Sequence, residues 1–153
     1  MDKLGLRHVD IYITHTIKGM LADNAWYGYV LAYTGRNGEL GTKEGYSRVG
    51  ERITMNSIIL SAMEESLKRM KEAVELNIYI DSQYISNMFK TGTVERWKGN
   101  GFLNSKGKKI VDFPKWETVL ELCEKHVVDV IYVQSHEFTL YLEEEMKRKE
   151  NEQ

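Results

Sequence analysis

Residues 77–85, Asn77-Ile78-Tyr79-Ile80-Asp81-Ser82-Gln83-Tyr84-Ile85, are the most informative segment of the sequence. The apolar run that ends at Ile80 is typical of a short buried strand. Asp81 and Ser82 follow it, and both are residue types that cap the beginning of a helix. The segment therefore predicts a strand that passes directly into a helix, with a carboxylate where the strand ends.

Three strands and a helix are predicted upstream of this segment. Residues 9–13 alternate apolar and polar side chains, which is the period of a half-buried strand. A second strand is predicted over residues 26–33 and a third over about 39–47, joined through Gly35-Arg36-Asn37-Gly38, where Asn-Gly is a hairpin signal. From Thr54 to Ala73 apolar residues recur at three- and four-residue steps, which predicts an amphipathic helix.

The downstream half of the sequence adds two helices and a strand. Residues 91–113 are rich in turn-forming residues, with lysines between the glycines. Pro114 fits the first turn of a helix that runs toward His126. Residues 127–133 form a dense β-branched strand, and a charged helix is predicted over about 139–151.

This order of elements predicts the α/β fold class. An antiparallel hairpin precedes two strand–helix units, so we expect a mixed five-stranded sheet, with three antiparallel strands and then two parallel ones, flanked by helices. Neither a repeat nor a linker is recognisable, so we expect residues 1–153 to form a single domain.

Composition excludes several classes of protein. The net charge of the 153 residues is only -2, so any basic surface must be local. Cys123 is the single cysteine, which excludes an internal disulfide and argues against a thiolate zinc cluster. Residues 1–7 lack the apolar core of a secretory signal, and no apolar run approaches the roughly 20 residues that span a bilayer. We expect a cytoplasmic protein with no membrane partner.

Short motifs spread over almost the whole chain resemble the type 1 ribonuclease H family. Ile80–Ile85 is similar to the family's third catalytic segment, where T-D-S-Q-Y-V is typical. Trp97-Lys98 followed by Gly101-Phe102 resembles the basic protrusion, written W-K-x-x-G-W. Tyr-Val-Gln-Ser-His at 132–136 resembles W-V-K-G-H, which bears the family's mobile histidine. The resemblance implies a ribonuclease H-like fold, action on RNA/DNA hybrids, and two metal ions about 4 Å apart that are held by four carboxylates.

The same resemblance indicates that the catalytic carboxylate set is degenerate. Thr14 and Asn56 stand where the family has its first aspartate and its helix glutamate. Asp81 matches the third carboxylate. The fourth position falls on Met146, and Glu145 fits it if the preceding loop is one residue shorter.

Two histidines accompany these positions. His136 matches the mobile histidine, which makes it a candidate for proton transfer beside a bound metal. His15 follows Thr14, and because strand side chains alternate we expect it on the opposite side of the sheet. Magnesium prefers carboxylate oxygens, so Asp81 with Glu145 would hold Mg²⁺ or Mn²⁺ weakly at most, and no cofactor is expected to be required.

Residues 94–110 are predicted to form the basic protrusion, which we call the basic arm. We assign nucleic-acid contacts to seven of its residues: Arg96, Trp97, Lys98, Phe102, Lys106, Lys108 and Lys109. Cations of this kind grip a phosphate backbone, and aromatic side chains stack on bases. The alternative interpretation is a solvated, glycine-rich loop with no partner.

Three functions remain open at this point. The favoured hypothesis is a catalytically impaired ribonuclease H-like protein that binds RNA/DNA hybrid or duplex. The second is a metal-dependent nuclease with the reduced ligand set Asp81, Glu145 and Asn56. The third is a protein-interaction or decoy role toward a nucleic-acid-processing partner, with Met20-Leu21-Ala22 and Trp26 as an exposed apolar contact loop. Both a monomer and a homodimer are compatible with the sequence.

Overall fold

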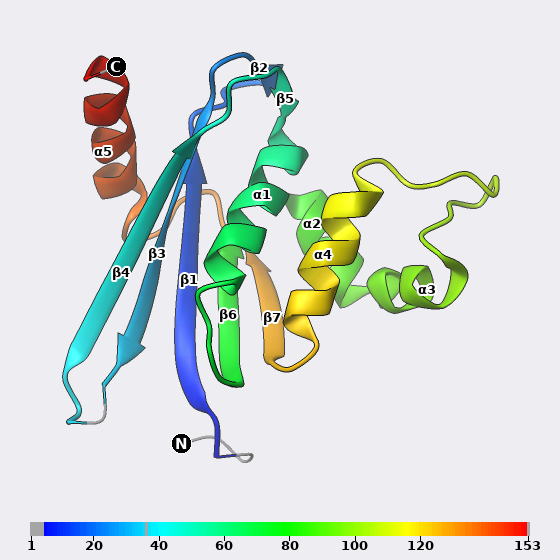
Figure 1. The fold of residues 1–153 in the computed structure, drawn as a ribbon, viewed down its shortest axis with the longest axis horizontal. Coiled ribbons are helices and arrows are strands. Elements are labelled where there is room, and N and C mark those ends of the chain that lie inside the picture. Colours follow the sequence, from blue (N-terminus) through cyan, green and yellow to red (C-terminus); the bar gives the residue numbers. More distant parts are fainter. Residues whose placement is uncertain (1–4, 36, 153) are drawn as a thin grey trace.

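The computed structural model describes residues 5–35 and 37–152, and its centre is a five-stranded sheet in the order β4-β3-β1-β6-β7 (Figure 1). The strands are β1 (Arg7–His15), β3 (Trp26–Thr34), β4 (Leu40–Arg48), β6 (Val74–Ile80) and β7 (Val127–Tyr132). The β1, β3 and β4 strands are antiparallel neighbours, whereas β6 and β7 continue the sheet in parallel with β1. The predicted mixed sheet is confirmed. The predicted turn at 35–38 includes Arg36, which lies outside the described residues.

Helices cover both faces of the sheet. They are α1 (Met55–Leu67), α2 (Gln83–Lys90), α3 (Thr93–Asn100), α4 (Phe113–Cys123) and α5 (Thr139–Asn151). Figure 1 shows α1 and α4 on one side of the sheet and α5 on the other. Within the described residues the longest helices have 13 residues, and none is long and apolar enough to cross a membrane.

The core is divided between the two faces because strand side chains alternate. Ile11 of β1 belongs to the larger cluster, which lies under α1, α2 and α4. Tyr12 points to the other face and packs with Leu142 and Met146 of α5. The alternation at residues 9–13 thus gives the central strand two buried faces.

Some element boundaries differ from the predictions. Helix α1 ends at Leu67 rather than Ala73, and β6 begins at Val74 because its parallel register with β1 extends that far. Helix α3 lies inside the segment expected to be turn-rich. Gly92 precedes it and Gly101 follows it, both with φ of 77°. These glycines mark the ends of a short helix and do not exclude one.

A second, two-stranded sheet was not predicted. It pairs β2 (Leu21–Ala22) with β5 (Ile53–Thr54). Immediately after β5, the Met55 N–H donates to the Met20 carbonyl at 2.9 Å. These bonds tie the loop after β1 to the beginning of α1. Met20 is 86% exposed, as expected for this loop. Trp26 was expected in the same exposed loop, but it begins β3, is 5% exposed and packs in the cluster on the α5 face, so that part of the prediction was wrong.

Candidate active-site pocket and basic arm

A pocket of about 310 Å³ lies at the end of the sheet where β1, β6 and β7 finish. It is lined by Thr14 and His15 of β1, by Asp81 directly after β6, by His136 after β7, and by Glu143 of α5. Parallel strands end at the same edge of a sheet, which is why residues distant in sequence meet here. Three of the five predicted site residues, Thr14, Asp81 and His136, therefore share one pocket.

The Asp81 carboxylate is available to this pocket because its neighbour caps the helix. Ser82 Oγ accepts a hydrogen bond from the Ile85 N–H at 3.1 Å, which identifies Ser82 as the N-cap of α2. Asp81 instead turns toward β1, where His15 Nε2 lies 2.9 Å from Oδ1 and 3.0 Å from Oδ2. The carboxylate is thus held by an imidazole from the neighbouring strand.

The protonation of His15 follows from its other ring nitrogen. His15 Nδ1 lies 3.1 Å from the Ile17 backbone nitrogen, which has a hydrogen to donate. Nδ1 must therefore be the acceptor, so the ring hydrogen is on Nε2 and is donated to Asp81. The His15 side chain is only 3% exposed. It is a buried, neutral donor to a carboxylate.

His136 has the same arrangement beside Thr14. Its Nδ1 accepts from the Phe138 N–H at 3.1 Å, so Nε2 carries the hydrogen. Nε2 lies 3.0 Å from the Ile13 carbonyl oxygen and 3.1 Å from Thr14 Oγ1, and it shares its hydrogen between them. Burial lowers the pKa of His136, which keeps this imidazole neutral.

The remaining two predicted site residues do not line the pocket. Asn56 Oδ1 accepts from Ser82 Oγ at 2.6 Å. Glu145 is paired with Arg148 at 2.8 Å, and that ion pair lowers the pKa of the Glu145 carboxyl. Glu143, one turn beyond the start of α5, is the helix acid that reaches the pocket. Its carboxylate lies 3.9 Å from Lys18 Nζ.

These residues do not fit a pair of divalent metal ions. Within residues 5–35 and 37–152, no group of three or more histidine, cysteine or acidic side chains is placed to hold a metal. The pocket has two carboxylates, Asp81 and Glu143, and both oxygens of Asp81 already accept from His15. A tight metal pair requires more hard anionic oxygens than these two carboxylates supply.

Sequence reasoning missed His15 and Glu143 as pocket residues. The signal for His15 was the parallel pairing of β1 with β6, which brings the end of one strand beside the residue after the other. The signal for Glu143 was weaker. Glu143 lies three residues before Met146, the position given by the family spacing, and therefore one helical turn earlier on the same side of α5.

The aromatic residues of the basic arm are not free to stack on bases, which corrects the prediction made for them. Trp97 is 5% exposed and Phe102 is 7% exposed. The Trp97 ring packs edge-on against Trp116 of α4, with centroids 5.0 Å apart. Both aromatic side chains belong to the main core, so they anchor the arm to the domain.

The cations of the basic arm are exposed, and only some of them have a partner within the protein. Lys98 lies 3.5 Å from Glu95, and Lys109 Nζ donates to the Gly101 carbonyl at 2.7 Å. The remaining three have no ion pair among the described residues: Arg96, Lys106 and Lys108. Figure 1 shows α3 and the loop after it extending away from the sheet.

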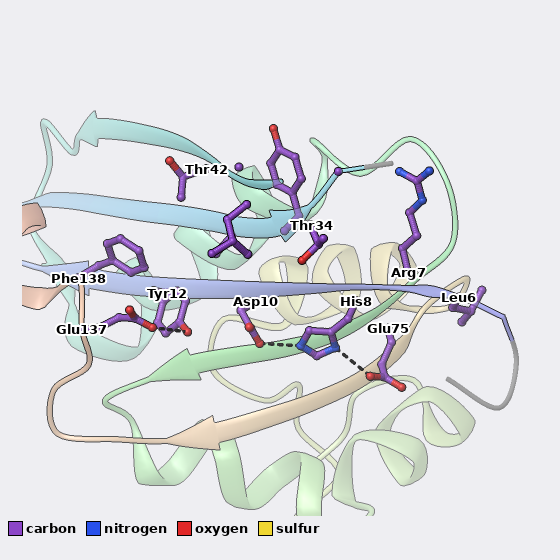
Figure 2. Close-up of a pocket in the computed structure, with 15 residues that line it drawn as sticks. Leu6, Arg7, His8, Asp10, Tyr12, Thr34, Thr42, Glu75, Glu137 and Phe138 are labelled. Atoms are coloured by element: carbon purple, nitrogen blue, oxygen red, sulfur yellow. Dashed lines mark hydrogen bonds and ion pairs between the residues drawn. The ribbon is translucent and has the colours of Figure 1, made fainter. Parts of the chain in front are cut away.

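A larger cavity of about 920 Å³ lies on the α5 side of the sheet, toward the start of β1 (Figure 2). Figure 2 shows His8 between Asp10 and Glu75, and each carboxylate has an oxygen 2.8 Å from a ring nitrogen. The acids that line this larger cavity already accept hydrogen bonds from neighbouring side chains, and Asp81 does not line the cavity. The candidate active site is the smaller pocket.

Comparison with known proteins points to one family, RNase H. The family model for RNase H matches residues 19–152, a range that begins after β1. Ribonuclease H of Thermoanaerobacter sp. (strain X514) is 34% identical over 128 residues, which are 84% of this chain and 78% of that protein. Ribonuclease H of Syntrophus aciditrophicus (strain SB) is 35% identical over 112 residues, 72% of this chain and 60% of that protein.

Solved structures show the same fold at lower sequence identity. LC9-RNase H1, a type 1 RNase H with the type 2 active-site motif, superposes with a TM-score of 0.73 at 17% identity, over 94% of this chain and 72% of that one. The foamy viral protease–reverse transcriptase in complex with RNA/DNA hybrid gives a TM-score of 0.66 at 17% identity, over 90% of this chain and 18% of that one. From the extent of the family match and the identity to curated relatives, this chain belongs to the ribonuclease H family.

Proposed function

We propose that this chain binds RNA/DNA hybrid or nucleic-acid duplex through its basic arm and does not hydrolyse it by a two-metal mechanism. The observation that carries the proposal is the set of exposed cations Arg96, Lys106 and Lys108, which have no ion-pair partner among the described residues. Membership of the ribonuclease H family and the likeness to a reverse transcriptase solved with RNA/DNA hybrid support this class of ligand.

The tip of the arm is held in one shape before any ligand arrives. Asn104 Oδ1 accepts from the backbone N–H of Lys106 at 2.9 Å and of Lys108 at 3.1 Å. Gly107 takes φ of 77°, which a turn of this kind requires. A preformed loop loses little conformational freedom when it binds, so more of the electrostatic attraction is retained as affinity.

The binding test replaces two lysines of the tip by acids. Fluorescence anisotropy with a labelled hybrid duplex would be measured for wild type and for Lys106→Glu with Lys108→Glu, between 50 and 200 mM salt. We expect at least about tenfold weaker binding. The salt slope should also be smaller by about 0.7–0.9 for each phosphate that the variant no longer neutralises.

The matched control is Lys43→Glu with Lys71→Glu, which makes the same change in net charge at exposed positions on β4 and after α1. An equal fall in affinity in the control and the tip variant would show that only net charge matters. Unchanged binding in the tip variant would exclude the arm as the binding surface.

The absence of two-metal hydrolysis is supported by the engagement of Asp81 with His15 and by the neutral side chains at Thr14 and Asn56. The test is incubation of a hybrid duplex with purified protein in Mg²⁺ and, separately, in Mn²⁺. We expect no product in either metal. Metal-dependent cleavage that disappears in Asp81→Asn would contradict this half of the proposal and leave the binding half standing.

A ribonuclease H endonuclease is the second candidate. It is favoured by the two carboxylates that share the pocket, Asp81 and Glu143, and by curated relatives named Ribonuclease H at 34% identity. Cleavage that is abolished in both Asp81→Asn and Glu143→Gln, and retained in Glu145→Gln, would select this candidate. Glu145 serves as the control because its partner is Arg148.

A further inference from the structure

His15 occupies the carboxylate that a metal ion would need. Its Nε2–H is directed at both oxygens of Asp81, at 2.9 and 3.0 Å, and these are the atoms through which an aspartate binds a divalent ion. The imidazole cannot easily turn away, because Nδ1 is fixed by the Ile17 N–H at 3.1 Å and the side chain is 3% exposed.

We propose that His15 is a positioning residue that weakens divalent metal binding in this pocket by holding both oxygens of the Asp81 carboxylate. A metal chelated by both oxygens of Asp81 would take the position of the His15 Nε2–H and leave this buried donor without its acceptor, and an unsatisfied buried donor is costly. That cost corresponds to roughly ten- to a hundredfold in metal affinity. The inference concerns metal binding alone and does not depend on whether the chain binds nucleic acid.

His15 and His136 do not serve instead as an acid–base pair in this geometry. Each imidazole has one nitrogen bonded to a backbone N–H and the other bonded to an oxygen of the protein. General acid–base catalysis needs a nitrogen within hydrogen-bond reach of the substrate. With all four nitrogens engaged, the two histidines fasten the end of β1 to the ends of β6 and β7.

The test measures Mn²⁺ binding by electron paramagnetic resonance on the protein without nucleic acid. Wild type is compared with His15→Ala, which removes the donor, and with His15→Gln, whose side-chain amide can replace Nε2–H. We expect His15→Ala to bind Mn²⁺ at least about tenfold more tightly than wild type, and His15→Gln to resemble wild type. Adding Asp81→Asn to His15→Ala should abolish the gain.

The proposal is overturned if folded His15→Ala, checked by circular dichroism, binds Mn²⁺ no better than wild type. It is also overturned if the gain survives Asp81→Asn. Should His15→Ala fail to fold, nitrogen-15 NMR of wild-type imidazoles decides the matter at pH 7. We expect a His15 Nε2–H signal that 10 mM Mg²⁺ leaves unchanged, whereas its disappearance or displacement by Mg²⁺ would contradict the proposal.

Discussion

At the scale of single residues, the antiparallel half of the sheet depends on glycines that make room for tyrosines. Gly45 of β4 pairs with Tyr29 of β3, and a Cβ atom at Gly45 would overlap the tyrosine ring and hydroxyl. Tyr29 is 1% exposed, so its ring has little space into which to move. Gly45 is therefore a packing position within the strand.

We predict that Gly45→Ala lowers the free energy of unfolding by about 1–3 kcal/mol, the usual cost of overpacking. Urea denaturation followed by circular dichroism would measure it. Gly50→Ala is the control, because a Cβ atom there meets no atom within 4 Å and its φ is not in the left-handed region. That substitution should stay within about 0.5 kcal/mol of wild type. Equal effects at the two positions would contradict the packing explanation.

Part of the candidate site could be predicted from the sequence motifs, and part could not. Asp81, Thr14 and His136 share one pocket, as the motifs around them predict, because those motifs place each residue at a strand end. His15 was expected on the opposite side of β1 from Thr14, and its side chain does face the main core. It nevertheless reaches Asp81, because β1 ends at His15 and Asp81 follows the end of the neighbouring strand β6. Hydrogen-bond partners of this kind depend on the packing of neighbouring strands, which no local pattern contains.

At the scale of elements, the strands were predicted more accurately than the helices. Strand alternation is a local property, so the five strands of the main sheet could be located from the sequence, and the hairpin and the two strand–helix units predicted which are antiparallel and which parallel. The ends of α1 and the existence of α3 depend on tertiary structure. Trp97 is buried against Trp116, and this contact stabilises α3, a helix of only eight residues flanked by glycines.

The contact of His8 with Asp10 and Glu75, which links β1 to β6, predicts that the stability of the fold depends on pH. Burial alone would lower the pKa of His8, but hydrogen bonds and attraction from Asp10 and Glu75 outweigh it and hold that pKa above 6.5. The protonated imidazole thus links the start of β1 to β6. Because the folded-state pKa is raised, this stabilisation is complete below the unfolded-state pKa of about 6.5 and disappears as the pH rises through the folded-state pKa.

We expect the difference in unfolding free energy between wild type and His8→Gln to be larger at pH 6 than at pH 9, by urea denaturation at both values. Comparing the two proteins at each pH cancels the titration of other groups, including His126, whose pKa burial lowers. In Asp10→Asn with Glu75→Gln, the same His8→Gln difference should no longer depend on pH. A difference that is equal at pH 6 and pH 9 in the wild-type background would refute the assignment.

At the scale of the whole molecule, positive and negative side chains lie in different places, although the net charge is close to zero. The net charge is -2, yet unpaired cations gather on the arm and acids line the cavity near the start of β1. This distribution of charge is the basis of the proposed binding of nucleic acid at the arm. The fold itself is assembled from two apolar clusters and hydrogen-bonded strands, and the described residues contain no group of three or more histidine, cysteine or acidic side chains placed to hold a metal.

We therefore predict that magnesium does not stabilise the folded chain. A ligand that binds only the native state adds RT ln(1 + [L]/Kd), so 10 mM Mg²⁺ at a site with Kd of about 0.1 mM would add about 2.7 kcal/mol. For a chain of this size that gain corresponds to a rise in Tm of about 5–10 °C. With His15 on Asp81 and neutral residues at Thr14 and Asn56, we expect a rise below about 1 °C in calorimetry, relative to NaCl of equal ionic strength. A rise of about 5 °C or more that Asp81→Asn removes would mean that metal binds at the pocket despite the engaged carboxylate.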